Sequence, residues 1–196
     1  YDQAITAIQE SIYRLGVEYI DLYLIHWPNP KQGKYVEAWK ALIDAQKLGL
    51  IKSIGVCNFL EEHIDTLEKE TGVLPAVNQI ELHPYFNQKD VLEYHQEKGI
   101  IIEAWSPLGR ASEVINDKEI GKIAEKYNKT IPQIILKWHV QNGIVPIPKS
   151  TSNERQLQNL DVFDFYLESE DLHAIDALTK ADGRLKDQDP ATYEEF

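Results

Sequence analysis

The stretch Tyr19-Ile20-Asp21-Leu22-Tyr23-Leu24-Ile25-His26-Trp27-Pro28 gives the clearest indication of the fold. Residues 19–25 are mostly aliphatic or aromatic, which favours a β-strand, and the turn signal Pro28-Asn29-Pro30 ends it. His26 and Trp27 therefore lie where a strand ends and a loop begins. In a parallel α/β barrel the functional side chains gather at this end of the strands, so the stretch predicts both a strand and a candidate site.

Helices and strands alternate along the rest of the chain. Apolar runs predict strands at residues 19–25, 51–57, 76–82, 100–104 and 144–147. Helical spacing predicts helices at residues 2–15, 35–48, 61–71, 88–98, 117–127, 132–141, 153–160 and 170–180, with Asp2 and Thr130 as caps and Gly16 as a terminator. The acidic tail from Gly183 to Phe196 is expected to be a loop or disordered.

This alternation predicts a parallel α/β fold, for which a doubly wound sheet and a (β/α)8 TIM barrel are both possible. No Gly-x-Gly-x-x-Gly follows a strand, so the fingerprint of the wound sheet is missing. Polar or unusual residues do end the strands, as a barrel predicts: His26, Asn58, Gln79, Trp105 and Lys149. Five strands cannot close an eight-stranded barrel.

The chain contains no methionine and opens at Tyr1 inside a helical pattern. We therefore expect residues 1–182 to supply the last five strands and their helices of a (β/α)8 barrel, followed by a tail at 183–196. We also expect an upstream part to have been removed.

Composition excludes several classes of function. The net charge of -12 disfavours nucleic acid or an anionic membrane as the main partner. A single cysteine, Cys57, excludes an internal disulfide and fits a reducing compartment, so we expect a cytoplasmic protein. No apolar run approaches the roughly 18 residues of a membrane span, and no signal peptide is visible.

Several strand-end side chains have suitable chemistry, although each also has a plainer interpretation. The His26 imidazole could donate a hydrogen bond to a carbonyl oxygen or relay a proton, or it could be structural. The amides of Asn58 and Gln79 could hold a carboxamide, or could satisfy a turn and a strand edge. The Trp105 indole could stack on an aromatic ring, or could pack in the core.

Residues 148–155, Pro-Lys-Ser-Thr-Ser-Asn-Glu-Arg, join the last strand to a helix. Unpaired backbone N–H groups and the helix dipole create an anion site at such a junction, and Lys149, Ser150 and Arg155 add further donors. The segment predicts a phosphate site, with plain helix capping as the alternative. Ser106 and the backbone near Leu108 could also meet a phosphate, on weaker grounds.

The remaining histidines and the cysteine have structural interpretations. His63, His95 and His173 lie on predicted helix faces and are expected to be solvated, whereas His83 and His139 are expected to be structural. Cys57 is expected to be a small packed residue rather than a nucleophile. No spacing of His, Cys, Asp or Glu indicates a metal site.

Four segments, read in order, resemble the aldo-keto reductases over nearly the whole chain. They are residues 22–28, residues 51–59, residues 78–84, and residues 147–150 with Arg155 and Asn159. Trp105 and the general run of the sequence resemble the bacterial branch related to 2,5-diketo-gluconate reductases.

The resemblance implies NADPH-dependent reduction of an aldehyde or ketone by a cytoplasmic protein that is a monomer when full length. It assigns His26 to catalysis and Trp27 to the substrate pocket. It assigns the cofactor to Cys57, Asn58, Gln79, Trp105, Ser106, Leu108, Lys149, Ser150, Thr151, Arg155, Gln158 and Asn159. Lys149, Ser150 and Arg155 would bind the 2′-phosphate, which favours NADPH over NADH.

Three departures from the family pattern qualify this expectation. Cys57 stands where serine is usual, and Gln158 stands where glutamate is frequent. The family's catalytic set is an aspartate, a tyrosine, a lysine and the histidine, and only His26 of this sequence matches it. The full-length protein is therefore expected to be the enzyme and this chain to be inactive. The alternatives are a non-catalytic nucleotide-binding module and a truncated product with an interaction role.

Overall fold

A computed structural model describes residues 1–186 and 188–196 of the chain. The chain divides into two compact units. The first unit holds residues 1–79, 90–101 and 188–196, and the second holds residues 80–89 and 102–186.

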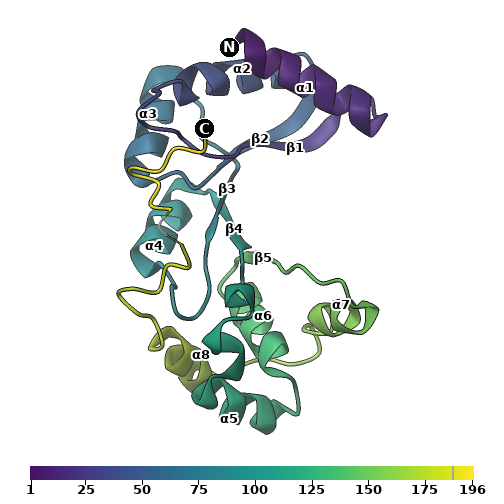
Figure 1. The fold of residues 1–196 in the computed structure, drawn as a ribbon, viewed down its shortest axis with the longest axis vertical. Helices are drawn as coiled ribbons and strands as arrows, with labels where there is room; N and C mark the ends of the chain where they lie inside the picture. Colours follow the sequence, from purple (N-terminus) through teal and green to yellow (C-terminus); the bar gives the residue numbers. More distant parts are fainter. Residues whose placement is uncertain (187) are drawn as a thin grey trace. The chain divides into compact units, whose positions relative to one another are not determined.

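The first unit alternates helices with strands (Figure 1). Its elements are α1 Asp2–Leu15, β1 Ile20–Ile25, α2 Tyr35–Lys47, β2 Ile51–Cys57, α3 Glu61–Thr71 and α4 Lys89–Lys98. Strands β3 Val77–Glu81 and β4 Ile101–Trp105 each supply residues to both units. The second unit continues with the 3-10 turns η1 Gly109–Ala111 and η2 Glu113–Asn116, then α5 Lys118–Tyr127, α6 Ile131–Gln141, β5 Val145–Ile147, α7 Asn153–Leu160 and α8 Ser169–Asp176.

The five strands are hydrogen-bonded in the order in which they occur along the chain. Strand β2 is parallel to β1 and to β3, and β5 is parallel to β4. A doubly wound sheet reverses its strand order at a switch point, whereas a barrel follows the chain. The parallel α/β prediction is confirmed, and the strand order is that of a (β/α)8 fold.

Large apolar side chains from helices and strands form the core of the first unit. Ile8 of α1, Trp39 of α2 and Ile64 of α3 are fully buried in it. The Trp39 indole N–H donates to the Val73 carbonyl oxygen at 3.1 Å, so its one polar atom is satisfied. Gly55 lets β1 and β3 approach β2 closely, because a Cβ at this position would lie 2.6 Å from the Val77 carbonyl oxygen.

Most predicted element bounds agree with the structure within one or two residues, and three local predictions were wrong. Tyr1, not Asp2, is the N-cap of α1. Helix α8 ends at Asp176 instead of residue 180, and the turns η1 and η2 were missed. Thr130 does cap α6, where its hydroxyl accepts from the Gln133 N–H.

The described residues include no helix long and apolar enough to cross a membrane.

Candidate functional site

The neighbouring strands β1, β2 and β3 bring together three of the predicted site residues. His26 follows β1, Asn58 follows β2 and Gln79 lies within β3. The Asn58 side-chain N–H donates to the His26 carbonyl oxygen at 3.1 Å, and the Asn58 backbone N–H donates to the Gln79 carbonyl oxygen at 2.9 Å. One buried amide thus ties the histidine to the neighbouring strand.

The backbone of Asn58 adopts a left-handed conformation with φ at 60°. Asparagine tolerates this region better than most residues, and such strain concentrates where a structure holds a functional group in place. Cys57 is buried and lies opposite Gln79 in the β2–β3 register, so the expectation of a packed thiol is confirmed.

Asn78 and His95 form buried hydrogen bonds next to the segment that carries Asn58. The sequence did not indicate these contacts. Asn78 is fully buried, donates to the Phe59 carbonyl oxygen at 2.9 Å and lies 2.8 Å from His95 Nε2. The other ring nitrogen of His95 lies 2.7 Å from the Val91 carbonyl oxygen. Burial lowers the pKa of His95 and keeps its imidazole neutral.

The expectation that His63 and His95 are solvated was therefore wrong. His63 is 5% exposed and packs edge-on against Tyr35 and Phe59, and burial lowers its pKa as well. Both side chains lie on the face of a helix that is directed into the core. His173 is exposed, and His83 and His139 are buried, as predicted.

The C-terminal tail contacts His26 and Trp27. His26 Nδ1 lies 2.7 Å from Glu195 Oε1, and the buried Trp27 ring lies 4.5 Å from that of Tyr193. The described residues of the tail form no helix or strand, as expected, but residues 193–196 are bound to the loop after β1. A separation of 169 residues leaves no local sequence signal for the pair His26–Glu195.

At the end of β4, Trp105 and Ser106 are both half-buried. Ser106 adopts a left-handed backbone conformation with φ at 51°, which a serine rarely does. Arg110 donates from Nε to the Ser106 hydroxyl oxygen at 3.1 Å, and its guanidinium lies 5.9 Å from the Trp105 ring centre. Arg110 is thus an exposed cation beside two predicted cofactor residues. No sequence motif indicated Arg110 as a site residue. Leu108 is half-buried directly before η1.

The predicted phosphate segment forms a turn that enters helix α7. Ser152 is the N-cap of α7, and its hydroxyl accepts from the Arg155 backbone N–H at 3.4 Å. The Ser152 backbone N–H donates in turn to the Ser150 hydroxyl oxygen at 3.2 Å. Lys149, Thr151 and Arg155 are exposed at this helix start, the position that favours an anion.

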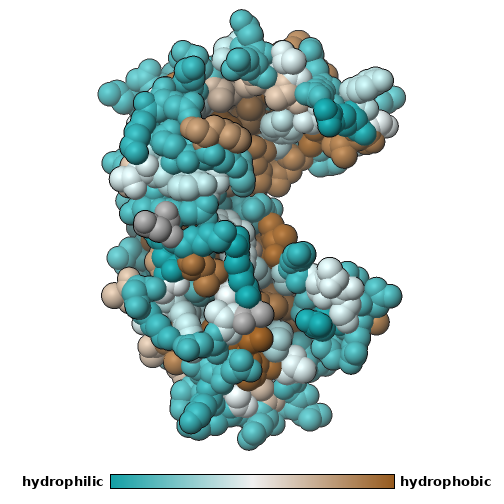
Figure 2. Space-filling view, in the orientation of Figure 1, coloured by the Kyte–Doolittle hydropathy of each residue, from teal (hydrophilic) through white to brown (hydrophobic). Residues whose placement is uncertain are grey.

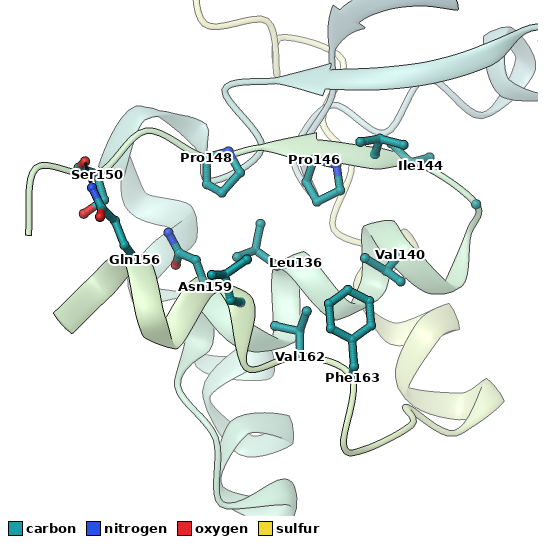
Figure 3. Close-up of a pocket in the computed structure, with 13 residues that line it drawn as sticks. Leu136, Val140, Ile144, Pro146, Pro148, Ser150, Gln156, Asn159, Val162 and Phe163 are labelled. Carbon is teal, nitrogen blue, oxygen red and sulfur yellow. Dashed lines mark hydrogen bonds between the residues drawn. The ribbon is translucent and has the colours of Figure 1, made fainter. Parts of the chain in front are cut away.

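A cavity of about 790 Å³ lies beside α7, entirely within the second unit (Figure 3). Ser150, Gln156 and Asn159 line one end, and apolar side chains including Val140, Val162 and Phe163 line the other. Figure 2 shows hydrophobic side chains at the surface near β5, where Val145 and Ile147 are about half exposed.

Of the predicted residues on α7, Asn159 lines this cavity and Gln158 does not. The Gln158 side-chain amide lies at 3.5 Å from Glu154 Oε1 on the same helix. Gln156 also lines the cavity, although no sequence motif indicated it. Helical spacing explains the difference, because residues 156 and 159 lie on one face of a helix.

Comparison with known proteins gives a consistent result. The family described as the Aldo/keto reductase family matches residues 1–180. The 2,5-diketo-D-gluconic acid reductase B of Corynebacterium sp. (strain SHS752001) is 49% identical over 194 residues, which are 99% of this chain and 69% of that protein. The methylglyoxal reductase DkgA of Yersinia pestis is 46% identical over 95% of this chain and 67% of its own length.

Solved structures agree with this result. The crystal structure of a Gox0644 mutant in complex with NADPH has a TM-score of 0.95 at 48% sequence identity. The match covers 99% of this chain and 71% of that one.

Proposed function

The chain belongs to the aldo/keto reductase family, and we propose that it binds NADPH for the reduction of an aldehyde or ketone to an alcohol. The observation that carries this proposal is the link that Asn58 makes between His26 and Gln79 at 3.1 and 2.9 Å. His26 and Asn58 follow two neighbouring parallel strands directly, and such folds carry their chemistry at the carboxyl ends of the strands.

The donor set of the chain suits a phosphorylated dinucleotide. The amides of Asn58 and Gln79 would hold the carboxamide, with Cys57 beside them, and the Trp105 indole would stack on the nicotinamide ring. Ser106 and Leu108 would border the pyrophosphate. Lys149, Ser150 and Arg155 at the start of α7 would bind the 2′-phosphate. Asn159, with Gln158 beside it, would contact the adenine, and Thr151 belongs to the same cofactor-binding segment.

When bound, NADPH supplies a hydride to the carbonyl carbon, and the carbonyl oxygen takes up a proton. His26 would hold that oxygen by a hydrogen bond and so oppose the charge that develops on it. The buried Trp27 ring would form an apolar wall of the substrate pocket. The aldehydes and ketones named for the relatives DkgA and 2,5-diketo-D-gluconic acid reductase B indicate small carbonyl compounds as the first substrates to test.

We also propose that the 196-residue chain turns over slowly by itself. The family resemblance assigns the proton to a tyrosine, and no motif in this sequence matches it. A positioned acid contributes about 10²–10⁴-fold to such a rate.

The experiment separates binding from turnover. NADPH and NADH are titrated into the chain by fluorescence, and NADPH oxidation is then followed with a panel of aldehydes. We expect NADPH to bind more tightly than NADH, with little oxidation above background. Failure to bind either nucleotide would contradict the cofactor proposal, and fast oxidation would contradict the proposal of slow turnover.

His26→Gln with His173→Gln as its control tests the histidine. Any residual rate should fall for the first variant and stay unchanged for the exposed His173 on α8. An equal loss in both would contradict the assignment of His26.

A further inference from the structure

Glu195 of the tail contacts the side chain of His26 directly. The distance from His26 Nδ1 to Glu195 Oε1 is 2.7 Å, although the imidazole is 68% exposed. An ionised carboxylate can only accept hydrogen bonds, so the proton of this contact lies on Nδ1. The structure therefore selects one of the two neutral forms of the ring.

Residues 193–196, which we term the clasp, hold this carboxylate in place by binding the loop of residues 29–32. The contacts are from the Glu195 backbone N–H to Asn29 Oδ1 (2.9 Å), from the Lys31 backbone N–H to Glu194 Oε1 (2.7 Å) and from Gln32 Nε2 to the Phe196 carbonyl oxygen (3.3 Å). Tyr193 adds its ring contact with Trp27. Contacts on both sides of Glu195 fix the backbone that carries it.

The backbone of His26 has its own hydrogen bond, separate from the contact of its ring with Glu195. Its carbonyl oxygen accepts from the Asn58 side chain, so the backbone of the histidine is fixed by β2 while its ring is fixed by the clasp. The carboxylate holds the imidazole in one tautomer and one orientation, as in metal sites and catalytic triads where a carboxylate orients an imidazole. The hydrogen bond from Asn58 holds the main chain of His26.

We infer that Glu195 is a positioning residue that holds the proton on His26 Nδ1 and reserves Nε2 for the oxygen of the substrate. This inference rests on the proposed function for its purpose, but the tautomer exists without cofactor or substrate. Nε2 then donates to the carbonyl oxygen of the substrate when the ring is doubly protonated, and it accepts from the hydroxyl group of the alcohol product when the ring is neutral. The position of a single carboxylate in the tail thereby decides which atom of His26 acts.

The test reads the tautomer by NMR of the chain with ¹⁵N-labelled histidine at mildly alkaline pH, where exposed imidazoles are neutral. Free imidazole side chains prefer the form with the proton on Nε2. We expect the His26 signals to show the Nδ1–H form in the unaltered chain. In Glu195→Ala the dominant form should change to Nε2–H.

Two further variants complete the design. Glu195→Gln keeps an oxygen that can accept from Nδ1, so it should retain the Nδ1–H form. That result would show that substitution at this position does not by itself disrupt the tail. Glu97→Ala removes an exposed carboxylate of α4 and should leave the His26 signals unchanged.

An Nε2–H form in the unaltered chain would overturn the inference, and so would an unchanged Nδ1–H form in Glu195→Ala. Neither result depends on NADPH. Failure of this inference would be seen in the NMR signals of His26, whereas failure of the proposed function would be seen in the nucleotide titrations.

Discussion

Two groups of polar residues differ in burial and in what their side chains bond to. The first is a buried set, Asn58, Asn78, His95 and His139, whose side chains bond to backbone carbonyl groups. The second is the proposed phosphate loop, residues 148–155, where Lys149 and Arg155 are exposed and the hydrogen bonds that join Ser152 to Ser150 and to Arg155 are 3.2–3.4 Å long. The buried set contributes to stability, whereas the charged side chains of the loop are exposed, as the proposed phosphate site requires.

The largest expected effect is a loss of folding stability in acid, and it comes from His139 of the buried set. Burial lowers the pKa of this imidazole to about 4, and its nitrogens lie 2.8 Å from the Ile135 carbonyl oxygen and 3.0 Å from that of Leu82. The unfolded chain takes up the proton near pH 6.5 and the folded chain only near pH 4. The contribution of His139 to the free energy of unfolding is therefore fully present above about pH 6.5. It decreases by about 3 kcal/mol as the pH falls towards 4.

Urea unfolding at a series of pH values measures this loss. The variant His139→Gln should reduce the dependence on pH, because its side chain does not titrate. An unchanged slope in that variant would show that another group is responsible.

Removal of the Asn78 side chain should give the next largest effect. Asn78→Ala leaves the Phe59 carbonyl oxygen and a nitrogen of His95 without their buried donor. We expect the free energy of unfolding to fall by about 2 kcal/mol in urea titrations. The exposed Asn153→Ala on α7 is the control, and a similar loss there would contradict the comparison.

The left-handed backbone at Asn58 predicts a smaller difference between two substitutions. Asn58→Ala and Asn58→Gly both lose the hydrogen bond to the His26 carbonyl oxygen. Only alanine is strained at φ 60°, so it should be less stable than the glycine variant by about 1 kcal/mol. Thermal unfolding of the pair measures this difference, and equal midpoints would mean that the backbone relaxes.

The phosphate loop should show almost no effect on stability. Arg155→Ala should change the free energy of unfolding by less than about 0.5 kcal/mol, because the side chain is exposed. Its affinity for NADPH should nevertheless fall about 10-fold, since one charge-assisted contact is lost. Titration with NADH is the control, and an equal loss of NADH affinity would place Arg155 away from the 2′-phosphate.

The two groups also differ in how far the sequence predicted them. Lys149, Ser150 and Arg155 were assigned to an anion site because a basic cluster before a helix start is a local pattern. The burial of His63 and His95 was not predicted, because helical spacing does not identify the buried face when that face carries polar residues. The left-handed backbone of Ser106 was not predicted either, because serine rarely adopts it and no local pattern indicates it.

The sequence by itself determined the alternation of helices and strands, the strand-end position of His26 and the resemblance that assigns its role. These follow from periodicity and from short motifs, which act over a few residues. Only the tertiary structure brought Glu195 to His26 Nδ1 and bound Asn78 to His95. Contacts between residues so far apart depend on how packed elements meet, and a hydrogen bond at 2.7 Å then decides which nitrogen of the His26 ring carries the proton.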